Sequence, residues 1–244
     1  MIPTRKIDEK FSQQFSTHMI FSDHLVKRED NLLRDKYDHN SFVYTSQPSV
    51  AEFIKAIDYQ KIREDGFIKL EGYLPLENSF GMEEEITLTM VLKNDANICS
   101  WKINPDIMLK NPDIKQLEQH YLRCYGSLYG VSFIVRNLRR LYEKLTYHGA
   151  FIKNKLVGSC YTFSADGYTC IDNLVVDEDY RHKYIATTII KQIVQNAYEK
   201  CNTVFLHADF DDTPRFMYEK MGFEEIDRCY EYTCTDISML NLNL

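Results

Sequence analysis

The sequence predicts an α/β protein in which a mixed central sheet flanked by helices spans residues 105–244 and a small α/β unit spans residues 1–104. Two observations favour this fold class. Amphipathic helices alternate with short apolar strands along the C-terminal half, and 44% of the 244 residues are hydrophobic, enough for a sizeable core. The polar run from Lys93 to Asn97, followed by Asn104 and Pro105, marks the expected boundary between the two units.

Within the N-terminal unit, one helix and two strands can be predicted. Ser49 begins a Ser-x-x-Glu capping box, and helical spacing of apolar residues then predicts a helix that ends near Gly66. Residues 67–70 and 86–92 have the composition and alternation of strands. Before Ser49 we expect only a short helix or two around residues 29–37, because aromatic and charged residues mix there without a period. One hypothesis is that this unit is a degenerate half-copy of the C-terminal fold.

The C-terminal unit is predicted to contain two helices, three strands, a helix, a strand, a short helix and a final strand. The helices follow the i, i+3, i+4 spacing of one apolar face, and Asp166 with Gly167 forms the residue pair of a tight hairpin turn. In chain order, the elements are expected at residues 114–125, 131–145, 150–152 with 156–163, 168–176, 185–197, 203–208, 214–221 and 229–233.

The charge and the cysteine content of the chain argue against several classes of function. The chain has 36 acidic and 29 basic residues, a net charge of −7, which disfavours a nucleic-acid partner. The seven cysteines are odd in number and form no Cys-x-x-Cys pair, so we expect neither a disulfide framework nor a metal site. No stretch approaches the ~18 apolar residues of a membrane span, and the first twenty residues have no signal-peptide pattern, so a cytoplasmic location without membrane contact is expected.

Two segments carry the expected chemistry. In the first, the apolar strand 171–176 leads through residues 177–184 directly into the predicted helix at Ile185. In the second, residues 213–223, a short helix carries Tyr-Glu-Lys and ends in Gly-Phe. Together and in this order, the two segments resemble the acetyl-CoA segment and the second signature of the GNAT superfamily of N-acetyltransferases. The resemblance covers about residues 105–244 and implies a GNAT fold with acetyl-CoA as the acyl donor.

The first segment also has physical properties of an anion site that do not depend on the resemblance. A strand that leads directly into a helix leaves the first N–H groups of the helix unpaired, at the positive end of its dipole. Arg181, His182 and Lys183 add cationic side chains at the same place, which favours a diphosphate such as that of coenzyme A. The alternative interpretation is an ordinary solvated helix start whose charges contact nothing.

By resemblance, the backbone of Leu174, Val175 and Val176 would contact the pantetheine arm and the thioester. The diphosphate would lie against the turn and the helix start, at Arg181, His182, Lys183, Tyr184, Ile185, Ala186 and Thr187. Tyr184 stands where the family normally has glycine, and Glu178 stands where a proline is common. We therefore expect the Tyr184 ring either to crowd the diphosphate or to swing outward over the nucleotide.

Acetyl transfer also needs an acid for the leaving thiolate and a base for the attacking amine. By resemblance, Tyr218 would protonate the thiolate; the alternative is a tyrosine that only packs in the core. Asp172 and His207 are candidate bases, directly or through water, and a hydrogen-bonded structural role is the alternative for each.

Acidic residues also follow the predicted strands, at 177–179 and at 209, 211 and 212, where they could draw a cationic amine or form a merely solvated rim. The leading hypothesis is an N-acetyltransferase that moves an acetyl group from acetyl-CoA to a primary amine of a small molecule or peptide, by direct attack on the thioester. The alternative is a non-catalytic GNAT-like domain that senses acyl-CoA or binds another protein.

Overall fold

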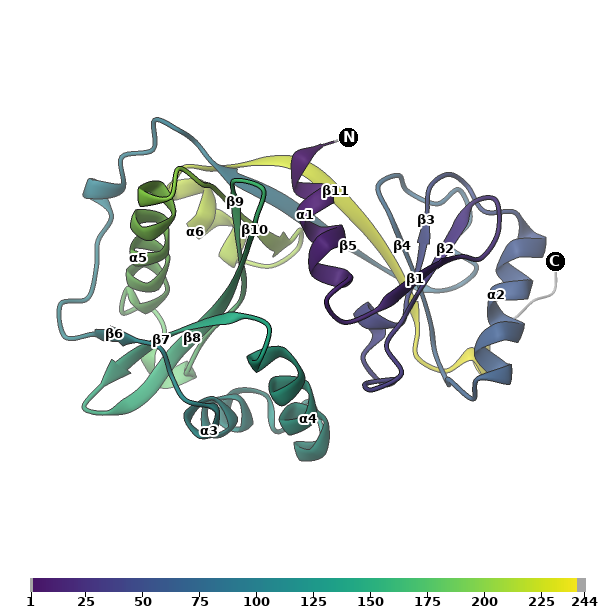
Figure 1. Ribbon diagram of the computed structural model, residues 1–244, viewed down its shortest axis with the longest axis horizontal. Helices are drawn as coiled ribbons and strands as arrows, with labels where there is room; N and C mark the ends of the chain where they lie inside the picture. The colour runs from purple at the N-terminus through teal and green to yellow at the C-terminus, as the bar shows by residue number, and fades with distance from the viewer. Residues whose placement is uncertain (1, 241–244) are drawn as a thin grey trace.

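The computed structural model describes residues 2–240, and its strands form one eleven-stranded sheet that runs through the whole molecule (Figure 1). The strand order is β1-β2-β3-β4-β11-β5-β10-β9-β8-β7-β6. The elements of the first half are α1 (Pro3–Ser12), β1 (Thr17–Ile20), β2 (Leu25–Glu29), β3 (Phe42–Tyr44), α2 (Val50–Ile62), β4 (Ile68–Gly72) and β5 (Glu83–Leu92). Those of the second half are β6 (Met108–Lys110), α3 (Ile114–Tyr125), α4 (Val131–Tyr142), β7 (Thr146–Ile152), β8 (Lys155–Ala165), β9 (Tyr168–Val176), α5 (Ile185–Glu199), β10 (Thr203–Asp209), α6 (Pro214–Lys220) and β11 (Phe223–Cys234).

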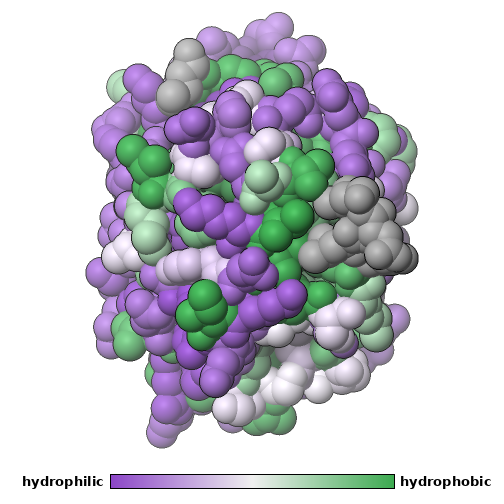
Figure 2. All heavy atoms as spheres, turned by 90° about the vertical axis from the view of Figure 1, so that its right-hand side faces the viewer, coloured by the Kyte–Doolittle hydropathy of each residue, from purple (hydrophilic) through white to green (hydrophobic). Residues whose placement is uncertain are grey.

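Strands β1 to β4 and helix α2 form a small N-terminal lobe. The predicted capping box is present, because the Ser49 side chain accepts from the Glu52 N–H and the Glu52 side chain accepts from the Ser49 N–H. Phe42, Phe53 and Ile57 are fully buried in the core of this lobe. Seen from its free end, the lobe is mainly hydrophilic, with one patch of hydrophobic side chains just right of the centre of the view and others scattered singly (Figure 2).

The prediction of helical structure around residues 29–37 is wrong. Strand β2 ends at Glu29, and the chain then passes through turns to a single 3-10 turn at Tyr37–His39. The buried Asn40 side chain holds this loop: its Oδ1 accepts from the Asp30 N–H, and its Nδ2 donates to the Leu33 carbonyl. Such side-chain bonds to the backbone compete with helix formation.

The C-terminal lobe has the predicted order of elements except for the short strand β6, which was not predicted and precedes α3. Its sheet is covered on both faces. Helix α5 packs on one face with Ile185, Ile189 and Ile193, while α3 and α4 pack on the other face. Gly158 on β8 permits the close approach of α5, because a Cβ at this position would lie 2.7 Å from Cγ2 of Ile185. This contact positions the first turn of α5 directly above the sheet.

The sheet does not divide at the expected boundary between residues 104 and 105. Strand β5, which precedes that boundary, inserts between β10 and β11 and is antiparallel to both. Strand β11 continues into the N-terminal lobe, where its second half pairs with β4. Helix α1 also lies between the lobes and packs against β8 and β9 (Figure 1). The two lobes therefore share strands and a helix, and the 104/105 boundary stays a prediction from the sequence.

None of the described helices is long and apolar enough to cross a membrane.

Candidate functional site

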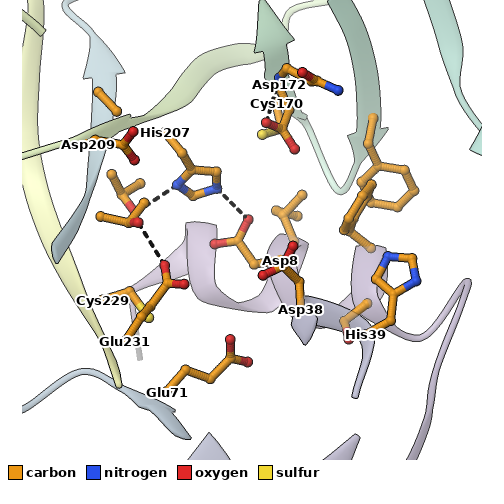
Figure 3. Close-up of a pocket in the computed structure, with 18 of the residues that line it drawn as sticks. Asp8, Asp38, His39, Glu71, Cys170, Asp172, His207, Asp209, Cys229 and Glu231 are labelled. Carbon is orange, nitrogen blue, oxygen red and sulfur yellow. Dashed lines mark hydrogen bonds and ion pairs between the residues drawn. The ribbon is translucent and has the colours of Figure 1, made fainter. Parts of the chain in front are cut away.

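A cavity of about 570 Å³ lies at the junction of the two lobes, and we call it the junction cavity (Figure 3). Its floor is the sheet face formed by β9, β10, β5, β11 and β4, and α1 forms part of its wall. Of the residues named in the sequence analysis, it brings together Asp172, Leu174, His207 and Tyr218, together with Asp209 and Asp212. Residues far apart in the chain thus meet in one site.

The junction cavity is strongly acidic. Seven carboxylates line it, against two basic side chains other than histidine, Arg28 and Lys36. On the N-terminal side the carboxylates are neutralised within the protein: Glu71 pairs with Arg28, and Lys69 pairs with both Asp38 and Glu231. This half of the cavity therefore has little charge left for a ligand.

On the C-terminal side, three carboxylates lack such partners. Asp172, Asp209 and Asp212 form no ion pair with any Lys, Arg or His of residues 2–240. Asp172 accepts hydrogen bonds of 2.6 Å from the Tyr161 hydroxyl and from the Asn173 N–H. Burial raises the pKa of Asp209, and the neighbouring charges of Asp212, Glu231 and Asp172 raise it further. A cation in this part of the cavity would relieve that repulsion.

Tyr218 lies on α6 at the edge of the same group of carboxylates. Its side chain is buried, and its ring packs edge-to-face against Phe223 with centroids 6.0 Å apart. Burial raises the pKa of Tyr218, and the charges of Asp172 and Asp212 add to the effect, so the hydroxyl keeps its proton at neutral pH. Tyr218 therefore packs in the core and also presents a protonated hydroxyl at the cavity.

His207 lies on β10 and is held from both sides. Its Nε2 is 3.0 Å from Oδ1 of Asp8 on α1, and its Nδ1 is 3.4 Å from Oγ1 of Thr89 on β5 (Figure 3). Burial lowers the pKa of His207, but Asp8 more than compensates, and the net pKa is well above the ordinary value of 6.5. Asp8 is a site residue that the sequence analysis did not identify.

Strands β9 and β10 separate beside the cavity. Their parallel pairing ends at Ile171 and Leu206, although β9 continues to Val176 and β10 to Asp209. Asn173, in the separated part of β9, has a left-handed backbone with φ of 51°, opposite an irregularity in the β8 register. The backbone of Leu174 to Val176 therefore has no β10 partner on this side.

The turn of residues 177–184 is organised by Asp177. Its carboxylate lies 2.7 Å from Nδ1 of His120, 3.2 Å from Nε of Arg123 and 3.0 Å from Nζ of Lys155. Burial raises the pKa of Asp177, but these partners outweigh burial and hold the pKa below its usual value. Asp177 is therefore a buried, neutralised carboxylate and not part of a solvated acidic rim, whereas Glu178 is exposed.

Tyr184 lies immediately before α5 with a left-handed backbone, φ 58° and ψ 22°. This is the conformation that glycine adopts most readily, so the backbone keeps the glycine-like geometry although the residue is tyrosine. The residue is 47% exposed, and its ring centroid lies 5.9 Å from Nζ of Lys102, so the ring is accessible to solvent. The exposure of the ring is compatible with the outward orientation of the two that were expected.

The start of α5 fits a diphosphate group. No side chain caps this helix, and the exposed residues Arg181, His182 and Lys183 lie just before its first turn. Uncapped N–H groups at the positive end of a helix, beside cationic side chains, are the donor set that phosphate oxygens require. The residues present therefore suit the acetyl-CoA that the resemblance implies.

Two clusters of side chains have the composition of metal ligands. Asp8, Cys170 and His207 form one, and His120, Cys124 and Asp177 form the other, with ligating atoms within 4.8 Å in each. In both clusters the carboxylate already has partners, His207 for Asp8 and two cationic side chains for Asp177. Hydrogen bonds and ion pairs thus account for both clusters, and we assign neither to a metal.

The comparisons with known proteins agree with this geometry. Residues 143–225 match the family model of the acetyltransferase (GNAT) domain. This segment is a GNAT domain. It contains the separated strand β9, the 177–184 turn, α5 and Tyr218. No curated protein matches the chain at a significant level.

Among solved structures, the chain is similar to a functionally unknown conserved protein from Staphylococcus epidermidis ATCC 12228, with 18% identity and a TM-score of 0.73 over 91% of this chain and 94% of that one. A GCN5-related N-acetyltransferase from Kribbella flavida is 13% identical, with a TM-score of 0.65 over 95% of each chain. A tandem GNAT protein from the clavulanic acid biosynthesis pathway is 13% identical, with a TM-score of 0.60 over 93% and 87%. These similarities show a shared fold, and they extend beyond the GNAT domain into the N-terminal lobe.

The expectation of a mixed α/β GNAT fold with a second, smaller unit is confirmed, and the tandem GNAT protein fits that description. Two features of the site were missed. The N-terminal lobe and α1 form much of the cavity wall, and Asp177 joins α3, β8 and the turn. Neither feature has a local signal in the sequence, because the partners of Asp8 and Asp177 lie on elements far away in the chain.

Proposed function

We propose that the protein transfers an acetyl group from acetyl-CoA to a primary amine that is bound as a cation in the junction cavity. The observation that carries this proposal is the group of three carboxylates without cationic partners, Asp172, Asp209 and Asp212, beside the protonated hydroxyl of Tyr218. A small molecule or an exposed amine of a peptide would be attracted by these charges before it is deprotonated.

Acetyl-CoA would be held by residues of the GNAT domain. The separated backbone of Leu174, Val175 and Val176 is available to the pantetheine arm, and the diphosphate would bind at the free N–H groups of Ile185, Ala186 and Thr187, aided by Arg181 to Lys183. The bound molecule supplies the activated acetyl group as a thioester. Tyr184 contributes its left-handed backbone to this site, and its side chain is exposed.

The side chains of the cavity would manage charge and protons. Asp172 and Asp209 hold the incoming ammonium group, and the amine loses its proton to a neighbouring base, for which Asp172 and His207 are the candidates. Tyr218 donates its Oη proton to the leaving sulfur as the thiolate forms; burial raises the pKa of this hydroxyl, so it carries the proton until that step. Bringing amine and thioester together removes much of the entropic cost of the reaction.

The first experiment measures acetyl-CoA binding and turnover with the full-length chain. Acetyl-CoA and coenzyme A should raise the melting temperature, because a ligand that binds only the native state stabilises it. Turnover would then be followed as thiol release with a panel of primary amines. Mono- and polycationic amines should react, whereas amines that carry a carboxylate should react poorly in the acidic cavity.

Tyr218→Phe tests the acid directly, since it keeps the ring and removes only the hydroxyl. Turnover should fall by about 10²- to 10⁴-fold with little change in melting temperature. Tyr198→Phe, an exposed tyrosine of α5 outside the junction cavity, is the matched control and should have no effect. Unchanged turnover in Tyr218→Phe would leave Tyr218 a packing residue.

The alternative, a non-catalytic domain that binds other proteins, predicts a different result. Neither acetyl-CoA nor coenzyme A would shift the melting temperature at millimolar concentration, and none of the amines would react. That outcome would replace the acetyltransferase proposal.

A further inference from the structure

Helix α1 belongs to the N-terminal part of the chain but is fixed on the GNAT side of the junction cavity. Near its start, Nη2 of Arg5 donates to Oδ1 of Asp227 at 2.7 Å. Near its end, the Phe11 ring stacks on the Tyr161 ring with centroids 6.2 Å apart, and Lys10 pairs with Asp166. Ile7 between them is 1% exposed. Contacts at both ends thus hold the middle of the helix in one place.

Asp8 is the residue of α1 that this docking brings to His207. The two side chains are each 25% exposed, and Oδ1 of Asp8 lies 3.0 Å from Nε2 of His207 (Figure 3). An ionised carboxylate can only accept a hydrogen bond, so Nε2 must carry the hydrogen. In the neutral imidazole, Nδ1 is then the acceptor, and the Thr89 hydroxyl 3.4 Å away can donate to it. Asp8 thereby selects the tautomer and the orientation of the ring.

The other candidate base is already occupied. The Asp172 carboxylate accepts from the Tyr161 hydroxyl and from its own neighbouring N–H, at 2.6 Å in each case. It therefore serves better as a fixed negative charge for the ammonium group than as a proton acceptor. His207 lies on the strand next to Asp172, because the parallel register places Cys170 beside Phe205, two residues earlier on each strand.

We propose that Asp8 is a positioning residue that orients His207 so that its Nδ1 accepts the proton lost by the acceptor amine. This inference rests on the proposed acetyltransferase function. The N–H bond of the ammonium group breaks, a new N–H bond forms at Nδ1, directly or through the Thr89 hydroxyl or a water molecule, and Asp8 balances the charge of the imidazolium. The N-terminal helix thus completes the active site of the GNAT domain, which lacks an equivalent carboxylate at this nitrogen among its described residues.

The pH dependence follows from the charges that face His207. These are Asp8 on α1, Asp172 and the Cys170 thiol on β9, and Asp209 on β10; across the cavity lie the Arg28 pair with Glu71 and the Cys229 thiol and Glu231 on β11. Burial lowers the pKa of His207 and Asp8 raises it, and the net pKa lies well above 6.5. The ring is neutral, and Nδ1 can accept a proton, only above this pKa, so kcat/KM should rise as the pH passes through it. Without the Asp8 charge, the pKa of His207 should fall.

The experiment compares Asp8→Asn, Asp8→Glu and Lys10→Ala in the full-length protein. Lys10→Ala is the matched control, because Lys10 also fixes α1 but does not touch His207. Three quantities are measured: the pKa of His207 from the imidazole signals in NMR, the pH profile of kcat/KM, and the affinity for acetyl-CoA. The NMR measurement does not require turnover.

In Asp8→Asn, kcat/KM at the optimum should fall by about 10- to 10³-fold. The acidic limb of the pH profile and the His207 pKa from NMR should move together to lower pH, while acetyl-CoA affinity stays unchanged. Asp8→Glu keeps the charge and should restore part of the rate and of the pKa, and it also serves as the test if Asp8→Asn does not fold. Lys10→Ala should leave the profile in place.

Several results would overturn the inference. If Asp8→Asn lowers the rate without moving the acidic limb or the His207 pKa, Asp8 only fixes α1. If the pKa falls but the rate and profile do not change, the pair is structural. Full activity of His207→Gln would remove His207 as the base. If the wild-type protein binds acetyl-CoA but acetylates no amine, the proposed function fails first, and this role of Asp8 fails with it.

Discussion

The 177–184 turn and the junction cavity both contain carboxylates, and the protein treats them in opposite ways. Asp177 is buried and surrounded by His120, Arg123 and Lys155, so its charge is used to hold the turn together. Asp209 has no cationic side chain as a partner among residues 2–240, and its pKa is raised by burial and by like charges. Changes at the turn should therefore reduce stability, whereas changes in the cavity should reduce the binding of a cationic ligand.

The largest effect on stability is expected for Asp177→Asn. The change leaves His120, Arg123 and Lys155 without their carboxylate, which we expect to lower the free energy of unfolding by about 2 to 3 kcal/mol. The value lies at the low end for a buried ion pair because Arg123 and Lys155 are partly exposed to water. Urea unfolding at neutral pH measures it, and Glu178→Gln, an exposed neighbour, should change stability by less than about 0.5 kcal/mol.

The same variant gives a pH test with a definite sign. The pKa of Asp177 is held below its ordinary value of 3.8, so its stabilisation is fully present above that pH and is lost as the pH falls through the lower folded value. The stabilities of wild type and Asp177→Asn should therefore converge below about pH 4. Equal stability of the two proteins at neutral pH would show that the ion pairs of Asp177 do not hold the turn.

The next largest effect on stability is expected for Gly158→Ala, a change that tests how α5 is positioned. The added Cβ would lie 2.7 Å from Cγ2 of the buried Ile185, so the helix start must shift. We expect a loss of about 1 to 2 kcal/mol in unfolding free energy, together with weaker coenzyme A binding by calorimetry. Gly66→Ala is the control, because nothing lies within 4 Å of a Cβ at that position. If Gly158→Ala bound coenzyme A with the affinity of the wild type, the close packing of α5 on β8 would not be needed for diphosphate binding.

In the cavity, Asp209→Asn should lower kcat/KM for a cationic amine by about tenfold, equivalent to about 1.4 kcal/mol. The effect should shrink at high salt, which screens partly exposed charges. Since the pKa of Asp209 is raised, its ionised form opposes folding at neutral pH, and the variant should be as stable as wild type or slightly more stable. Asp211→Asn, an exposed acid on the same loop outside the cavity, is the control. If Asp209→Asn instead lost stability and kept its kcat/KM, Asp209 would be a structural residue and not part of the amine site.

Elements whose signals are local could be predicted from the sequence. Helix α2 has its capping box within four residues, and α5 shows its apolar face over four turns, so both were found. Helix α1 and the β1–β2 hairpin were missed, because residues such as Ile7 are buried only by contact with distant strands. The insertion of β5 between β10 and β11 depends on long-range pairing that no sequence period records.

The candidate site divides in the same way. The uncapped start of α5 follows from a strand that leads through one turn into a helix, and that pattern could be recognised in the sequence. The partners of Asp177 come from α3 and β8, and Asp8 meets His207 across a separation of 199 residues, so spacing could not show either contact. The acidic run at 177–179 therefore looked uniform in the sequence, although Asp177 differs from Glu178 in burial and charge partners.

The smallest effect is expected for Tyr184→Gly, where turn and ligand site overlap. The left-handed backbone of Tyr184 costs a side-chain-bearing residue about 1 kcal/mol, so glycine should raise the free energy of unfolding by up to that amount. The side chain is exposed and its ring lies near Lys102, so we expect coenzyme A affinity to change by less than about threefold, or about 0.6 kcal/mol. Calorimetry with coenzyme A and urea unfolding measure the two quantities separately. Markedly tighter binding would mean that the ring crowds the diphosphate after all, and markedly weaker binding would mean that it lies over the nucleotide and contributes an aromatic contact.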